Sequence, residues 1–88
     1  MIIRVEYIKE MLFQLKNGSI SREEASNWAI KFREAYDNKR LIFSPLSKEN
    51  DIWDALQFIE LFSEKIEPET YLYSNIDLEE YIKQKGWL

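Results

Sequence analysis

The chain has 88 residues, a net charge of −4 at neutral pH, no cysteine and no histidine. Residues 1–88 are expected to form a single helical domain with one modest core. Without thiol and imidazole side chains, zinc, iron–sulfur and haem sites lose their usual ligands. We therefore expect no catalytic residue, no metal site and no cofactor. The excess of acidic over basic side chains predicts no nucleic-acid partner, because phosphate binding needs a basic surface.

Apolar stretches are short, and the longest run without a polar residue is three residues. No segment has the length of a transmembrane helix, and the first residues lack the basic and apolar regions typical of a signal peptide. The absence of cysteine fits a reducing compartment. We expect a cytoplasmic protein that does not contact a membrane.

The first element covers about residues 3–16 and admits two interpretations at its start. Ile3 and Tyr7 belong to a strand-like alternation of apolar and charged residues, so residues 2–7 are open between helix and strand. From Val5 onward, a stripe of apolar residues repeats at helical spacing, and we predict a helix for the whole segment. Gly18 should end it in the left-handed conformation.

Two strong amphipathic patterns predict the central helices. Ser21 and Glu24 have the spacing of a capping box and start a helix over about residues 22–37. The third helix, from residue 48 or 51 to 64, is apolar over more than half its circumference and should be the most buried element. The residues predicted to be almost fully buried are Trp28, Phe32, Leu56, Ile59 and Phe62.

The remaining segments complete the predicted architecture. Residues 39–45 should tuck their apolar side chains under the bundle as a lid, and residues 70–73 should be extended, with Leu72 in the core. A last helix starts at Ser74 or Asp77 and ends at Gly86, which brings Trp87 onto the helix. The predicted fold is all-α: a small antiparallel bundle of about four helices with an extended segment before the last helix.

Charge is divided unevenly along the chain. Residues 1–48 have nine basic and six acidic side chains, whereas residues 49–80 have ten acidic and one basic. An acidic surface favours a basic protein partner, although a solvated face that only aids solubility gives the same pattern. Aromatic residues within the acidic region favour a binding surface. The predicted partner-binding residues are Glu49, Asp51, Trp53, Asp54, Tyr71, Tyr73, Asp77 and Glu80.

Residues 20–29 and 71–74 together resemble small acidic helical immunity proteins of bacterial toxins, of the colicin, pyocin or polymorphic-toxin type. The resemblance implies a non-enzymatic inhibitor that occludes a basic toxin domain with its acidic surface. The alternative is a structural or regulatory interaction module without a toxin partner, in which a homodimer buries Trp53 or the tyrosines.

Overall fold

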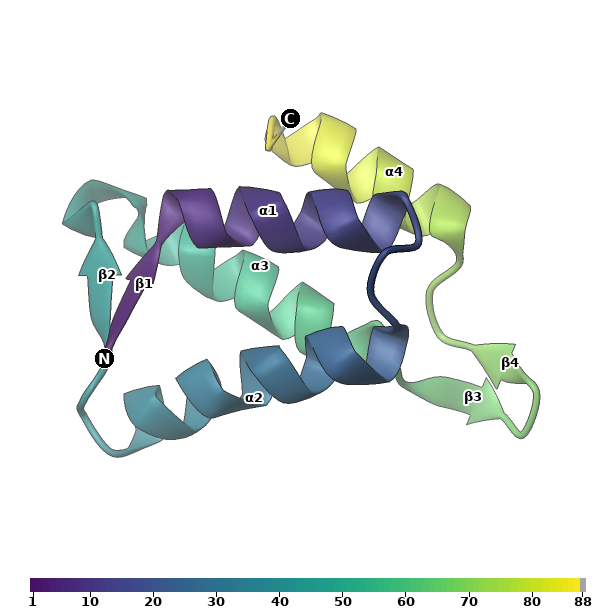
Figure 1. The fold of residues 1–88 in the computed structure, drawn as a ribbon, viewed down its shortest axis with the longest axis horizontal. Coiled ribbons are helices and arrows are strands. Elements are labelled where there is room, and N and C mark those ends of the chain that lie inside the picture. Colours follow the sequence, from purple (N-terminus) through teal and green to yellow (C-terminus); the bar gives the residue numbers. More distant parts are fainter. Residues whose placement is uncertain (88) are drawn as a thin grey trace.

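Four α-helices and two small sheets make up the computed structural model, which describes residues 1–87 (Figure 1). The elements are, in order, β1 (Ile2–Arg4), α1 (Val5–Lys16), α2 (Arg22–Asp37), β2 (Ile42–Ser44), the short 3-10 helix η1 (Leu46–Lys48), α3 (Glu49–Leu61), β3 (Lys65–Glu67), β4 (Thr70–Tyr71) and α4 (Asn75–Lys85). The four helices lie close to where the apolar patterns predict them. The all-α class is wrong, because two pairs of strands accompany the helices.

The helix α3 lies in the middle of the core, and its closest helical neighbour is α2. Phe62, Ile59 and Leu56 are almost completely buried, and Phe32 on α2 is buried as well, as predicted. Trp28 is only half-buried, so that prediction is wrong. Its ring meets Phe32 edge to face at a centroid distance of 4.9 Å, which places it at the rim of the core.

The first sheet joins the start of the chain to the connector after α2. β1 and β2 pair in parallel, with Ile3 opposite Phe43, and both of these side chains are buried. Their burial explains why the chain is extended here, because each short strand places one apolar side chain in the core. The helix α1 begins only at Val5. The connector is therefore a strand rather than a lid, and Ile42 faces outward with 58% of its surface exposed.

The second sheet is an antiparallel hairpin of β3 and β4 that extends beyond the helices (Figure 1). The backbone N–H of Leu72 donates to the carbonyl of Glu64 at 2.8 Å and closes the hairpin. Leu72 is exposed rather than in the core, and Tyr73 packs against the core instead. The predicted alternation fails here because the strand ends at Tyr71 and the chain then turns toward α4.

The predicted ends of α2 and α4 are confirmed, whereas α3 ends at Leu61 rather than at residue 64 and α1 begins at Val5 rather than at residue 3. Ser21 caps α2, and Ser74 caps α4 in a second capping box with Asp77. Gly86 adopts φ 70°, a left-handed conformation that side chains with a Cβ avoid. The N–H of Trp87 then donates to the carbonyl of Ile82 at 3.0 Å, and the indole is buried at the end of α4.

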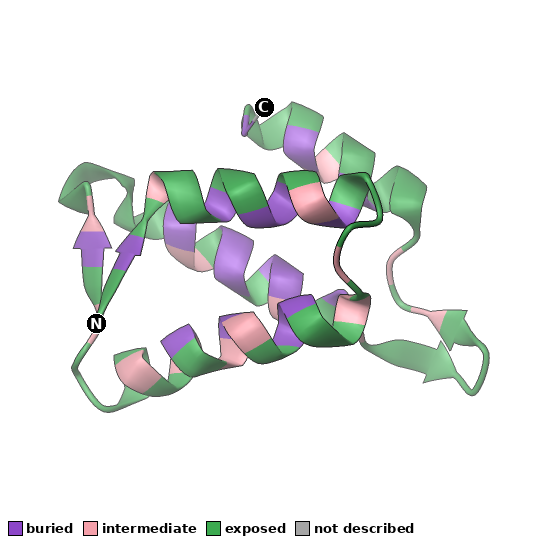
Figure 2. Ribbon diagram, viewed as in Figure 1, coloured by how far each residue is buried: buried purple, intermediate pink, exposed green. Residues whose placement is uncertain are grey.

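The two sheets mark opposite ends of a molecule that measures 36 × 26 × 20 Å (Figure 1). We call them the β1–β2 end, which includes η1, and the hairpin end. Figure 2 shows buried positions in both strands of the β1–β2 end and no buried position in the hairpin. None of the described helices is both long enough and apolar enough to cross a membrane.

Candidate functional site

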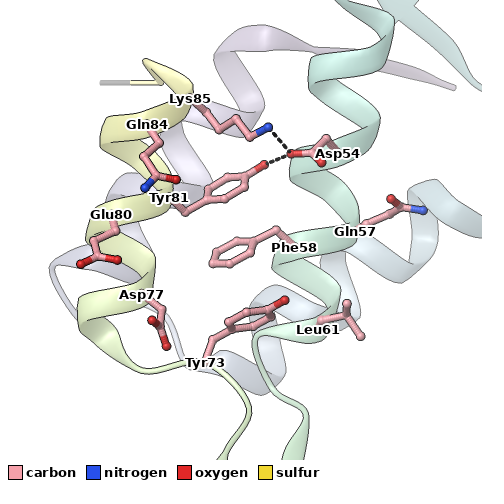
Figure 3. A pocket seen from close by; sticks show the side chains of 10 residues that line it. All are labelled: Asp54, Gln57, Phe58, Leu61, Tyr73, Asp77, Glu80, Tyr81, Gln84 and Lys85. Carbon is pink, nitrogen blue, oxygen red and sulfur yellow. Dashed lines mark hydrogen bonds and ion pairs between the residues drawn. The ribbon is translucent and has the colours of Figure 1, made fainter.

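The acidic residues predicted to bind a partner are divided among separate cavities. Asp54, Tyr73, Asp77 and Glu80 line a cavity of about 380 Å³ between α3 and α4 (Figure 3). Asp51 lines a different cavity. Glu49 lines a third, beside β2.

The two remaining predicted residues already have partners within the chain. Trp53 is half-buried, and its ring centroid lies 4.2 Å from that of Tyr36. The hydroxyl of Tyr71 donates to Glu23 at 3.1 Å, while the guanidinium of Arg22 lies 4.0 Å from the Tyr71 ring. Neither aromatic side chain stands free as an exposed anchor.

Stacked aromatic rings form one wall of the cavity between α3 and α4 (Figure 3). Phe58 and Tyr81 stack in parallel with centroids 4.0 Å apart, and Tyr73 lies 4.9 Å from Phe58. The Tyr81 hydroxyl donates to Asp54 Oδ2 at 2.6 Å. Burial, and then the hydrogen bond to Asp54, raise the pKa of Tyr81 above its ordinary value. At neutral pH Tyr81 is therefore a neutral donor that holds Asp54 in position.

A neighbouring cavity gathers basic side chains from three elements. Lys9 of α1, Lys48 of η1 and Lys85 of α4 line a space of about 140 Å³, which we call the lysine cavity. The buried indole of Trp87 lies against it, because the left-handed turn at Gly86 folds the end of the chain back. The sequence analysis missed this site because the three lysines lie far apart along the chain. The net positive charge of residues 1–48 was the available signal.

Two of these lysines are loosely paired with carboxylates. Lys48 Nζ lies 3.9 Å from Asp51 Oδ2, and Lys85 Nζ lies 3.7 Å from Asp54 Oδ2 (Figure 3). The side chains of both pairs are about half exposed or more, so each pair contributes at most about 1 kcal/mol. Within residues 1–87, Lys9 forms no ion pair. The cavity thus has ammonium groups available to an anion, above all to phosphate.

Further basic residues lie at the same end of the molecule. Arg4 is the last residue of β1 and donates to Ser44 Oγ at 3.3 Å. Lys39 and Arg40 lie in the loop that leads to β2, and all three residues are exposed. Basic side chains of the β1–β2 end are therefore accessible to solvent and to an anionic ligand.

Metal binding finds no support among the described residues. Residues 1–87 contain no group of three or more acidic side chains placed to hold a metal ion. Asp54 in the cavity between α3 and α4 accepts a hydrogen bond from Tyr81, and Asp77 accepts from Ser74 at the start of α4.

Comparison with known proteins identifies a family. The family model described as YxzC DNA-binding protein matches residues 3–85. The chain is also 37% identical over 68 residues to the uncharacterized protein YxzC of Bacillus subtilis strain 168, a match that covers 77% of this chain. The chain spans about half the length of that curated relative, since the match covers 50% of it. No solved structure matches the chain.

These findings correct the functional expectations from the sequence. The resemblance to toxin-immunity proteins is wrong, because the family model covers nearly the whole chain and describes a different class of protein. The expectations of a basic protein partner and of no nucleic-acid partner are wrong for the same reason. They relied on net charge and on charge counted along the chain, and neither reports how charges are distributed over the folded surface. The chain belongs to the YxzC DNA-binding protein family.

Proposed function

We propose that this chain binds DNA without catalysing a reaction, and that the lysine cavity supplies its main phosphate contacts. The observation that carries the proposal is the convergence of Lys9, Lys48 and Lys85, from three separate elements, on one cavity. Phosphate contacts of lysine provide most of the affinity in non-specific DNA binding. The description of the family supports the same function. Binding to DNA agrees with the cytoplasmic location expected from the sequence.

An acidic chain can bind DNA in this way if many of its acidic side chains lie away from the basic site. The exposed acidic residues Glu64, Glu67 and Glu69 lie in or beside the hairpin, whereas the lysine cavity adjoins the β1–β2 end. A duplex that approaches the lysine cavity keeps its phosphates distant from the hairpin, and salt screens the remaining repulsion over about 10 Å.

The small number of basic contacts limits the affinity. Each phosphate neutralised on duplex DNA contributes about −0.9 to the slope of log affinity against log salt concentration, so three contacts give a slope of about −2.7. We expect binding without strong sequence preference, because lysine contacts to phosphate position a protein but do not read bases. Binding should be strongest at low salt.

The experiment is a fluorescence anisotropy titration of a labelled duplex of about 20 base pairs, in about 50 mM salt and above. The test variant is K9Q/K48Q/K85Q. The matched control is K16Q/K31Q/K65Q, which removes the same number of exposed lysines elsewhere. The test variant should lose at least about tenfold in affinity and show a shallower salt slope, whereas the control should lose much less.

Two results contradict the proposal. If the wild-type protein shows no binding at low salt, DNA is not its ligand. Equal losses in the test variant and the control would show that only overall charge matters and that the lysine cavity is not the site. Circular dichroism of each variant confirms that helicity is retained.

A further inference from the structure

Two carboxylates lie beside lysines of the lysine cavity: Asp51 beside Lys48 and Asp54 beside Lys85. We infer that Asp51 and Asp54 compete with DNA phosphate for Lys48 and Lys85, and that they thereby restrict the cavity to ligands with several adjacent phosphates. This inference rests on the proposed function and assigns these two aspartates a role in ligand selection. It reverses their role in the sequence analysis, where they were expected to attract a basic partner.

The geometry places a carboxylate beside two of the three ammonium groups. Asp51 itself lines the lysine cavity and lies 3.9 Å from Lys48. Asp54 lies on the same helix, 3.7 Å from Lys85. An anion that enters the cavity must share the ammonium groups with these carboxylates or displace them, because each Nζ already lies within 4 Å of a carboxylate oxygen.

The lengths of these ion pairs favour exchange. A tight charge-assisted hydrogen bond between an ammonium and a carboxylate measures about 2.7–2.9 Å. The pairs of Lys48 and Lys85 are longer, and both are exposed to solvent. The carboxylates therefore reduce the local positive charge without blocking the lysines.

A single phosphate gains little from such a site, because it replaces one weak ion pair by another. Neighbouring phosphates of DNA can displace both carboxylates and also contact Lys9, which has no ion pair within the described residues. Duplex DNA provides about one negative charge per 1.7 Å of its axis, a density that a monovalent anion cannot match. The aspartates thus favour polyanions over single anions.

Tyr81 keeps Asp54 at the site. Its hydroxyl donates to the same oxygen, Asp54 Oδ2, that faces Lys85 (Figure 3). When Lys85 turns toward phosphate, Asp54 retains this hydrogen bond and stays beside the ligand. Tyr81 is in this sense a positioning residue, which acts on the ligand only through Asp54.

The test compares D51N/D54N with the control E67Q/E69Q. Both variants remove the same number of negative charges, but Glu67 and Glu69 lie at the hairpin end, away from the lysine cavity. Asparagine retains an oxygen that can accept from Tyr81, so the fold should persist. D51N/D54N should bind the labelled duplex about 3- to 10-fold more tightly than wild type, and the control should change by less than about twofold.

Two further measurements address mechanism. The gain from Asp51→Asn should disappear in a protein that also contains Lys48→Gln, because the aspartate acts through that lysine. In competition against the labelled duplex, tripolyphosphate should displace wild-type protein at a lower concentration than inorganic phosphate. The ratio of the two displacing concentrations, inorganic phosphate over tripolyphosphate, should be smaller in D51N/D54N than in wild type.

The outcomes separate this inference from the proposed function. If the lysine variant K9Q/K48Q/K85Q loses DNA binding but D51N/D54N behaves like E67Q/E69Q, the competition is absent and DNA binding stands. If neither wild type nor D51N/D54N binds DNA, both conclusions are overturned. If only D51N/D54N binds, the proposed function of the wild-type chain is overturned, and the competition by the two carboxylates is the reason that DNA does not bind.

Discussion

The β1–β2 pair and the β3–β4 hairpin lie at opposite ends of the molecule, yet only the first belongs to the core. Ile3 and Phe43 face each other across β1 and β2, and both are buried. All three residues of β3 are exposed. A parallel pair between distant segments needs buried side chains to offset the entropy of closing a long loop. A hairpin between neighbouring segments closes a short loop and therefore needs less burial to offset this entropy.

At the hairpin end, Arg22 makes the stabilising contacts instead. One nitrogen of the Arg22 guanidinium donates to the carbonyls of Phe62 and Tyr73, at 2.9 and 2.6 Å. The same group lies 4.0 Å from the ring centroids of Phe62 and Tyr71. Arg22 therefore has a structural role, and its charge is occupied within the fold. The lysines of the lysine cavity have no comparable contacts and remain available.

The largest expected effect is a loss of stability on truncating a side chain of the first sheet, compared with one of the hairpin. Phe43→Ala should lower the free energy of unfolding by about 3–5 kcal/mol, because it removes a buried ring and leaves a cavity. Ile66→Ala in the hairpin should change it by less than about 0.5 kcal/mol, since Ile66 is 63% exposed. Urea denaturation of both variants measures the difference. Similar losses would mean that the hairpin also contributes to the core.

Arg22→Met should destabilise the hairpin end by about 2–3 kcal/mol, because two carbonyls lose a charged donor and two rings lose a cation. Hydrogen exchange at the amide of Leu72, which bonds to Glu64, should accelerate more than exchange in α3. Lys65→Met serves as the control, since its ammonium lies farther from Tyr71, at 5.1 Å. A loss in the control as large as that in Arg22→Met would argue against a special role for the guanidinium.

Both capping boxes lie near the hairpin end, where α2 and α4 begin (Figure 1). Ser21→Ala and Ser74→Ala should each cost about 1 kcal/mol. Thermal or urea unfolding tests this, with Ser19→Ala as a control outside either capping box. The acidic residues in these first turns also interact favourably with the helix dipoles, which accounts for part of the charge at this end. Unchanged stability in both cap variants would contradict a stabilising role of the two serine caps.

The smallest effect concerns Tyr81, which lines the cavity between α3 and α4 and donates to the Asp54 oxygen that also faces Lys85. Its pKa is raised in the folded state by burial and by Asp54, so the unfolded chain releases this proton first as the pH rises. The contribution of Tyr81 to stability is complete below about pH 10, the ordinary tyrosine value, and is lost above it. Wild type should therefore lose more stability than Tyr81→Phe between about pH 9 and 11. Parallel urea titrations test this, and identical slopes would contradict it.

Local patterns in the sequence were enough to predict the four helices and the ends of α2 and α4. Ser21 with Glu24, and Ser74 with Asp77, lie three residues apart and determine where α2 and α4 begin. The buried positions of α3 follow from its apolar spacing, because a helix places such residues on one face whatever surrounds it. Trp28 is the exception: its spacing matches the core, but it is only half-buried, because packing around the helix and not spacing along it decides how much of a side chain is covered.

Contacts between distant segments were decided only by the tertiary structure. The pairing of β1 with β2 depends on Phe43 reaching the core beside Ile3, and neither segment has a strong strand pattern of its own. The lysine cavity depends on the packing of α1, η1 and α4, since Lys9, Lys48 and Lys85 share no motif. The sequence by itself determined the local helices and the net charge. The packing of those helices decided which charges meet, because electrostatic interactions depend on distance in space rather than along the chain.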